Sequence, residues 1–167
     1  MPDRRGTWLL PALAPACSAA VRAFYRFQAH GDPPHEGPVL FVANHPNSIV
    51  DAIVVAATAG RPIRFLAKAT LFDEPGLGVM IRAGGAIPVY RRQDDPALTD
   101  RNARVFAAVH EALAAGDAVG LFPEGLSHSE PALTQLRTGA ARISLGASER
   151  KGIHCPIVPV GIVARQK

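Results

Sequence analysis

The pattern of apolar and polar positions from residue 39 onward alternates between two kinds of segment. Short apolar runs of strand length alternate with longer stretches in which apolar residues recur at helical spacing. This alternation predicts right-handed crossovers and an α/β fold, with a mostly parallel sheet and helices on both faces. The predicted strands are 39–43, 63–67, 86–90, 118–122 and 157–163, and the predicted helices are 48–57, 72–83, 100–115 and 138–147.

The N-terminal part of the chain departs from this pattern. Several arginines accompany an apolar stretch that includes Trp8, Phe24 and Phe27. The combination is typical of an amphipathic helical segment in a membrane interface, and a helix packed on the domain explains the same residues equally well. Prolines at positions 11 and 15 interrupt the stretch, which makes a signal peptide or a spanning helix the weaker interpretation.

A stretch rich in proline and glycine, residues 30–38, separates this segment from the rest of the chain. The sequence therefore predicts an N-terminal membrane-interface segment and linker, residues 1–35, and one domain, residues 36–167. Because the sequence stops directly after a predicted strand, it indicates either a fragment or a short member of a longer type.

Composition narrows the function only in part. Of the 167 residues, 48% are hydrophobic and 19% are charged, which is typical of a globular domain. Aromatic residues make up 6%, which argues against a surface that stacks nucleic-acid bases. The net charge of +4 suits phosphate-bearing ligands or an anionic membrane, although many soluble proteins share it. Cysteines and histidines show no metal-ligand spacing, and the two cysteines form no disulfide framework.

Polar side chains follow three of the predicted strands at the point where each strand ends. His45 follows the first, the pair Arg91 and Arg92 follows the third, and Glu124 follows the fourth. Open parallel sheets bind their ligands outside the carboxyl ends of the strands. We therefore expect these side chains to share one edge of the sheet, and this edge to hold the functional site.

His45 and Asp51 form a candidate catalytic pair. A neutral imidazole takes a proton from a hydroxyl group near pH 7, and a carboxylate can orient the ring and stabilise the imidazolium. No serine or cysteine nucleophile accompanies the pair, so the base is expected to act directly on a substrate hydroxyl. The backbone amides of Asn47 and Ser48 are expected to stabilise an oxyanion. The alternative is a surface histidine with a solvated aspartate.

Three further motifs each allow two interpretations. Arg91 and Arg92 can clamp a phosphate, or they can be a solvated charge pair. The string from Phe122 to Gly125 presents the Glu124 carboxylate on a rigid turn, either to a ligand or to solvent. Thr138 stands at the start of a predicted helix. It can belong to an anion-binding site there, or it can be an ordinary N-cap residue.

Together these strings resemble the glycerophospholipid acyltransferase family. Its four motifs occur in order over about residues 36 to 162: His45 with Asp51, the 85–91 string ending in arginine, the 122–125 string Phe-Pro-Glu-Gly with Ser127, and the 157–161 strand with Pro159. The commonest form of the first motif has four residues between histidine and aspartate. This chain has five, which resembles a branch similar to glycerol-3-phosphate acyltransferases.

The resemblance implies an O-acyltransferase of phospholipid biosynthesis that acts at the cytoplasmic face of an anionic membrane. His45, oriented by Asp51, would deprotonate a hydroxyl of glycerol 3-phosphate or 1-acylglycerol 3-phosphate, which attacks the thioester of acyl-CoA or acyl-carrier protein. No metal or redox cofactor is implied. The implied substrate-binding residues are Asn44, Asn47, Ser48, Arg91, Arg92, Glu124, Gly125, Ser127 and Pro159.

Two other functions remain compatible with the sequence. One is a non-catalytic membrane- or lipid-binding domain, or a fragment of a larger acyltransferase. The other is a hydrolase that cleaves the thioester and releases free fatty acid without an acceptor. Transfer of a labelled acyl group to glycerol phosphate separates acyltransferase from both.

Overall fold

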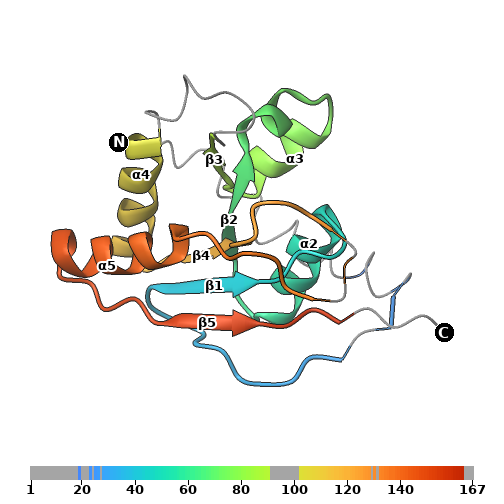
Figure 1. Cartoon of the computed structure of the whole chain (residues 1–167), viewed down its shortest axis with the longest axis horizontal. Coiled ribbons are helices and arrows are strands. Elements are labelled where there is room, and N and C mark those ends of the chain that lie inside the picture. Colours follow the sequence, from blue (N-terminus) through green and yellow to red (C-terminus); the bar gives the residue numbers. More distant parts are fainter. Residues whose placement is uncertain are drawn as a thin grey trace.

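The computed structural model describes residues 28–90, 102–128, 130 and 132–163, together with positions 19, 23, 25 and 26. Strands and helices alternate along the chain, as the apolar pattern predicts (Figure 1). The strands are β1 (Val39–Ala43), β2 (Ile63–Lys68), β3 (Ile87–Val89), β4 (Ala118–Leu121) and β5 (Ile157–Val160). The helices are α2 (Ile49–Thr58), η2 (Ala69–Asp73, a 3₁₀-helix), α3 (Leu77–Ala83), α4 (Asn102–Ala114) and α5 (Gly139–Lys151).

The described strands form one sheet of five strands in the order β3-β2-β4-β1-β5, and every pairing is parallel. β1 and β4 lie inside the sheet, where Val39 and Leu40 are completely buried. Strands buried on both faces require continuous apolar sequence, and the Val-Leu-Phe-Val-Ala run of β1 supplies it. The parallel α/β sheet predicted from the sequence is confirmed.

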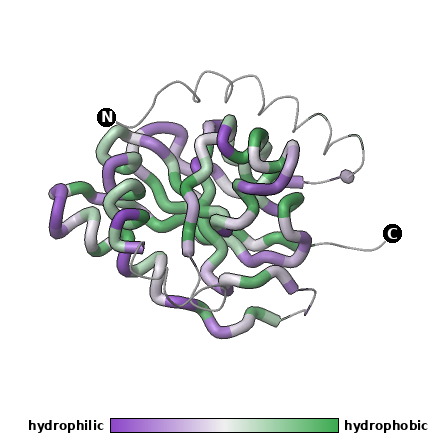
Figure 2. The backbone as a smooth tube through the Cα atoms, turned by 90° about the horizontal axis from the view of Figure 1, so that it is seen from above, coloured by the Kyte–Doolittle hydropathy of each residue, from purple (hydrophilic) through white to green (hydrophobic). Residues whose placement is uncertain are grey.

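Helices cover both faces of the sheet. On one face α4 and α5 bury Leu40 and Val119, and on the other α2 buries Phe41. Colouring by hydropathy shows apolar positions gathered along the strands at the centre and polar positions around them (Figure 2). Since neighbouring positions of β1 point to opposite faces, one strand contributes to both halves of the core.

Several element boundaries differ from the predicted ones. The predicted helix 72–83 is divided into η2 and α3, because Pro75 and Gly76 interrupt it and Gly76 has a positive φ of 73°. The last predicted helix is longer than expected: α5 continues to Lys151 and ends at Gly152, which adopts the left-handed conformation. The linker 30–38 forms neither helix nor strand.

Most of the predicted N-terminal helical segment lies outside the described residues, as does the predicted phosphate-binding pair Arg91 and Arg92. Within the part of the chain that the structure describes, no helix is long and apolar enough to cross a membrane.

Candidate active site

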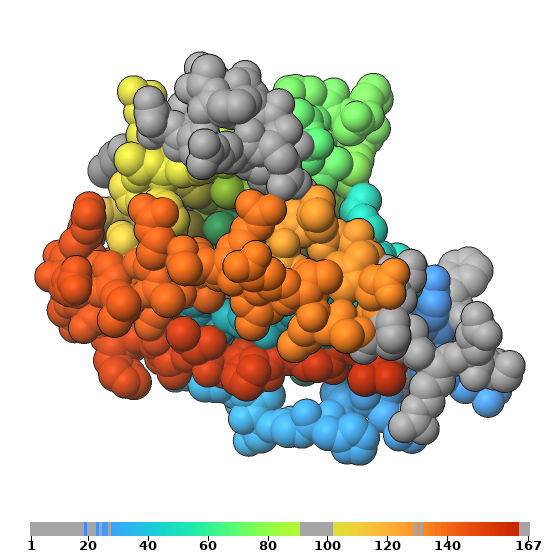
Figure 3. All heavy atoms as spheres, viewed as in Figure 1, coloured from blue at the N-terminus to red at the C-terminus, as the bar shows by residue number. Residues whose placement is uncertain are grey.

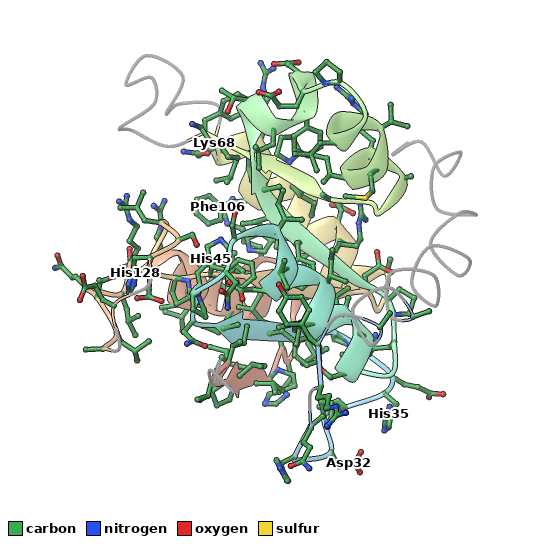
Figure 4. All side chains as sticks on the ribbon, turned by 90° about the vertical axis from the view of Figure 1, so that its right-hand side faces the viewer. Asp32, His35, His45, Lys68, Phe106 and His128 are labelled. Atoms are coloured by element: carbon green, nitrogen blue, oxygen red, sulfur yellow. The ribbon has the colours of Figure 1, made fainter. Side chains whose placement is uncertain are left out.

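The site lies at the carboxyl ends of β1 and β4, which Figure 4 shows facing the viewer. His45 follows β1 and Glu124 follows β4, and because these strands are neighbours, the two residues meet. The backbone amide of His45 donates a hydrogen bond to Oε1 of Glu124 over 3.2 Å. The prediction that these two residues share one sheet edge is therefore confirmed.

His45 and Asp51 are in direct contact. Nδ1 of His45 lies 2.9 Å from Oδ2 of Asp51, whose side chain is 1% exposed. The contact is possible because α2 begins at Ile49, so that His45 lies outside the helix and Asp51 in its first turn. Pro46 therefore lies outside the helix, two positions before its N-cap Ser48. The interpretation of this pair as a surface histidine with a solvated aspartate is wrong.

The contact with Asp51 fixes the tautomer of the imidazole. A carboxylate only accepts hydrogen bonds, so Nδ1 carries a proton, and in the neutral ring Nε2 is the nitrogen with the lone pair. Oδ2 of Asp51 also accepts the backbone amide of Asn47 at 2.7 Å, which holds the carboxylate in place. His45 is therefore arranged to take a proton at Nε2 while Asp51 stabilises the positive charge that forms on the ring.

An aromatic stack holds the ring of His45 from one side. The His45 and Phe122 rings are parallel within 11° and their centroids lie 3.8 Å apart. Phe65 of β2 continues the stack at 5.8 Å from Phe122. The space for Phe65 comes from Gly120 of β4, because a Cβ there would lie 2.5 Å from the Phe65 ring.

We expect Gly120→Ala to lower both stability and turnover. The new methyl group must displace the Phe65 ring, and overpacking of this kind costs about 1–3 kcal/mol of unfolding free energy. Phe65 then moves against Phe122, on which His45 rests. Urea unfolding and steady-state kinetics measure the two effects. Gly161→Ala is the matched control, because a Cβ there meets nothing within 4 Å. Equal behaviour of the two variants would contradict the stacking argument.

Glu124 is buried, with 3% exposure, and its carboxylate holds three parts of the chain together. Oε1 accepts the His45 amide, and Oε2 accepts Nε2 of His128 (2.5 Å), the Thr134 amide (2.9 Å) and the Thr134 hydroxyl (3.0 Å). Burial alone raises the pKa of Glu124, but these hydrogen bonds outweigh it and lower the pKa to about 2. The group is therefore ionised throughout the physiological range.

The lowered pKa of Glu124 predicts a loss of stability in acid. A group with a folded-state pKa of about 2 and an ordinary value of 4.5 stabilises the fold above pH 4.5, and this contribution is lost as pH falls toward 2. Its size is at most about 3 kcal/mol. Glu124→Gln places an amide donor against a donor, so it should be less stable than wild type at pH 7, and the difference should shrink in acid.

Thermal melting between pH 3 and 8 measures this difference. Glu111→Gln is the matched control: its hydrogen bond and ion pair with Lys151 also lower the pKa of Glu111, but this pair lies on the surface. Surface pairs contribute little to stability. A pH-independent gap between wild type and Glu124→Gln would contradict the role of the ionised carboxylate.

The two backbone amides predicted to form an oxyanion site are already engaged. The Asn47 amide donates to Asp51, and the Ser48 amide donates to Oγ of Ser127 over 3.0 Å. This prediction is corrected, because both donors have side-chain acceptors within the chain. Ser48 also has a φ of 54°, which is a strained conformation for a residue other than glycine, and it is held at the entry to α2. The hydrogen bond between Ser48 and Ser127 thus joins the loop after β1 to the loop after β4.

Two predicted substrate-binding residues have structural partners. The Asn44 side chain accepts the Ile162 amide (2.6 Å) and donates to the Ile162 carbonyl (2.9 Å), which extends the pairing of β1 with β5 beyond the strand ends. Pro159 lies in β5 opposite Val42. These contacts account for both residues without a ligand, and their predicted role in binding stays a prediction.

A hollow of about 720 Å³ borders His45. Apolar side chains from α2, β2, α3 and α4 form most of its wall, including Ile49, Phe65 and Phe106. Four cations also line it: Arg61, Lys68, Arg137 and Arg142. In Figure 4, His45, Phe106 and Lys68 follow one another across this end of the molecule. The combination of an apolar wall and several cations suits a molecule with an apolar chain and an anionic group.

The side chain of Arg137 packs directly against Gly125. Gly125 has a φ of 71°, and a Cβ there would lie 2.8 Å from Nε of Arg137. The Arg137 amide donates to the Pro123 carbonyl over 2.9 Å. Glycine at position 125 is therefore required both by its conformation and by the packing of the arginine, and the turn after β4 orders the start of α5.

Sequence reasoning missed three residues of the site. Phe122 was assigned only to the motif string, and His128 and Thr134 were given no role, although each contacts His45 or Glu124. The position of His128 four residues after Glu124 was a visible signal. It had no meaning without the turn that brings the two side chains together.

Comparisons with known proteins agree with this geometry. A sequence model of the family described as Acyltransferase matches residues 26–163. A search of curated proteins found none that matches. Among solved structures, the chain is similar to the 1-acyl-sn-glycerophosphate (LPA) acyltransferase PlsC from Thermotoga maritima, with a TM-score of 0.68 and 19% identity over 98% of this chain and 71% of that chain. At this identity the likeness shows a shared fold. Because the family match covers most of the chain, the protein belongs to the acyltransferase family, as its four ordered motifs predict.

Proposed function

We propose that the protein transfers a fatty acyl group from the thioester of acyl-CoA or acyl-carrier protein to a hydroxyl of glycerol 3-phosphate or 1-acylglycerol 3-phosphate. The observation that carries this proposal is the 2.9 Å contact between His45 and the buried Asp51, beside a hollow with apolar walls. The pair supplies a base for a hydroxyl group, and the hollow suits an acyl chain.

The reaction follows from the orientation of the imidazole. Nε2 of His45 takes the proton of the acceptor hydroxyl as its oxygen attacks the thioester carbon. The tetrahedral intermediate collapses, the carbon–sulfur bond breaks, and the leaving thiolate takes from the imidazolium the proton that came from the acceptor hydroxyl. Asp51 stabilises the imidazolium throughout. An ester and a free thiol result, without a covalent intermediate on the enzyme.

The acceptor phosphate is expected near the cations of the hollow. Lys68, Arg137 and Arg142 are among the cations that line it, and the guanidinium carbon of Arg142 lies 4.6 Å from the centre of the Phe106 ring. We retain Arg91 and Arg92, which follow β3 in the sequence, as the predicted bidentate clamp. The name of the Thermotoga protein, an LPA acyltransferase, supports a 1-acylated acceptor.

We further propose that the protein works at the cytoplasmic face of an anionic membrane, because its lipid product partitions into a bilayer. The N-terminal segment supplies apolar residues and arginines for this contact. Three leucines on the stretch between β4 and α5 are exposed by about half or more: Leu126, Leu133 and Leu136. That stretch lies across the middle of the surface in Figure 3.

Deletion of residues 1–28 should reduce sedimentation with anionic liposomes, and unchanged sedimentation would place the contact elsewhere.

An acceptor panel tests the reaction itself. The purified protein is incubated with a ¹⁴C-labelled acyl donor, either acyl-CoA or acyl-carrier protein. Each incubation also contains glycerol 3-phosphate, 1-acylglycerol 3-phosphate or no acceptor. Labelled ester that forms only with a phosphorylated acceptor supports the proposal. Free fatty acid released at the same rate without acceptor would instead identify a thioester hydrolase.

Arg91→Lys and Arg92→Lys should raise the acceptor KM, because lysine cannot form the planar fork.

A further inference from the structure

We infer that His128 is a positioning residue for acyl transfer, which acts on the catalytic base through Glu124. The inference rests on the proposed role of His45. The chain after β4 holds the backbone of His45 at two points. The His45 amide donates to Oε1 of Glu124 over 3.2 Å, and the His45 carbonyl accepts the backbone amide of His128 over 3.1 Å.

The side chain of His128 closes this arrangement into a loop. Its Nε2 lies 2.5 Å from Oε2 of Glu124, the carboxylate whose other oxygen holds His45. His128 therefore has two links to the base, one through its own backbone and one through the carboxylate. Figure 4 shows His128 beside His45 at the same end of the molecule.

The chemistry of the contact indicates what His128 supplies. Glu124 is ionised and only accepts, so Nε2 of His128 donates. Nδ1 of His128 is buried and has no hydrogen-bond partner among the residues that the structure describes. The ring thus contributes one donor at the position of Nε2. A glutamine side chain can place an amide donor at about the same distance from the backbone.

The consequence for catalysis concerns the position of His45 more than the binding of substrate. The ring of His45 is oriented by Asp51 and Phe122, but its backbone is held by the contacts described above. Misplacement of a reacting group by about 1 Å can cost as much as 100-fold in rate. Loss of the His128 donor is therefore expected to lower kcat while the acceptor KM and the acyl-donor KM stay unchanged.

The test compares His128→Ala with His128→Gln in the full chain, with labelled acyl-CoA and the acceptor that wild type uses. We expect roughly 10- to 100-fold lower kcat for His128→Ala, unchanged KM values, and recovery to within a few-fold of wild type for His128→Gln. His154→Ala is the control, because His154 is exposed and precedes β5, at the end of the sheet opposite the carboxyl ends of the strands. Circular dichroism checks that each variant is folded.

A double-mutant cycle tests whether His128 acts through Glu124. If it does, His128→Ala combined with Glu124→Gln should have a kcat no lower than Glu124→Gln alone. Additive losses would overturn the inference, as would full kcat in His128→Ala or a His128→Gln variant as slow as His128→Ala. Failure of the proposed function is a separate outcome, because wild type would then form no ester or His45→Ala would be as active as wild type.

Discussion

Replacement of His45 by alanine should lower the rate of acyl transfer by about 100-fold or more, the loss typical when a positioned general base is removed. The expectation follows from the fixed tautomer of the ring. Nδ1 is committed to Asp51, so Nε2 is the atom that takes the hydroxyl proton. Turnover is measured with labelled acyl-CoA and the phosphorylated acceptor that wild type prefers.

The chain contains its own control for this experiment. His35 lies 3.0 Å from Asp32, but the two side chains are 61% and 89% exposed. Figure 4 shows this second pair at the bottom of the view, well away from His45 near its middle. His35→Ala removes an equivalent histidine–aspartate contact, and it should leave turnover unchanged. If His45→Ala were folded and nearly as active as His35→Ala, the base would have to be another residue.

Asp51→Asn should lower kcat by about 10²–10⁴-fold, because it removes the charge that stabilises the imidazolium while it preserves the shape of the side chain. The asparagine oxygen can take the position of Oδ2 and accept from His45 and Asn47. Its amide nitrogen then takes the position of Oδ1, which is buried and has no hydrogen-bond partner within the described part of the chain. The substitution therefore changes mainly the electrostatics of the site.

Steady-state kinetics with both substrates measure this effect, and thermal melting checks the fold. Asp117→Asn is the matched control: Asp117 pairs with Arg64 over 3.2 Å, and its side chain is 42% exposed. It should have nearly normal kcat. If Asp51→Asn kept full kcat, Asp51 would serve only to hold the ring in place, and its negative charge would have no part in the rate.

The architecture could be predicted from the sequence because each signal for it is local. The buried run 39–43 predicted β1 with the correct bounds, and the helical spacing of Val105, Val109 and Leu113 predicted α4. Parallel strands joined by helices then require a sheet with one functional edge. Less regular local signals were interpreted less well. The predicted helix 72–83 is broken at Pro75 and Gly76. The sequence did not reveal this break, because apolar residues recur at helical spacing on both sides of it.

The candidate site was predicted only as far as single residues. His45, Asp51 and Glu124 were identified from their types and their positions after strands, and the first two contact each other as expected. The sequence did not reveal that Glu124 is buried by contacts with His128 and Thr134. Nor did it reveal that the amides expected to stabilise an oxyanion are engaged by Asp51 and Ser127.

The sequence by itself determined the order of the elements, the edge of the sheet that carries the site and the chemical groups delivered there. Each depends on apolar periodicity, on turn residues or on side-chain chemistry, all of which act over a few neighbouring positions. Only the tertiary structure decided what each group does. The contacts of Glu124 join positions 45, 128 and 134, and the stack on His45 joins β1, β2 and the turn after β4. Contacts between residues so far apart along the chain depend on the parallel register of β1, β2 and β4, which brings their carboxyl ends together and which no local pattern encodes.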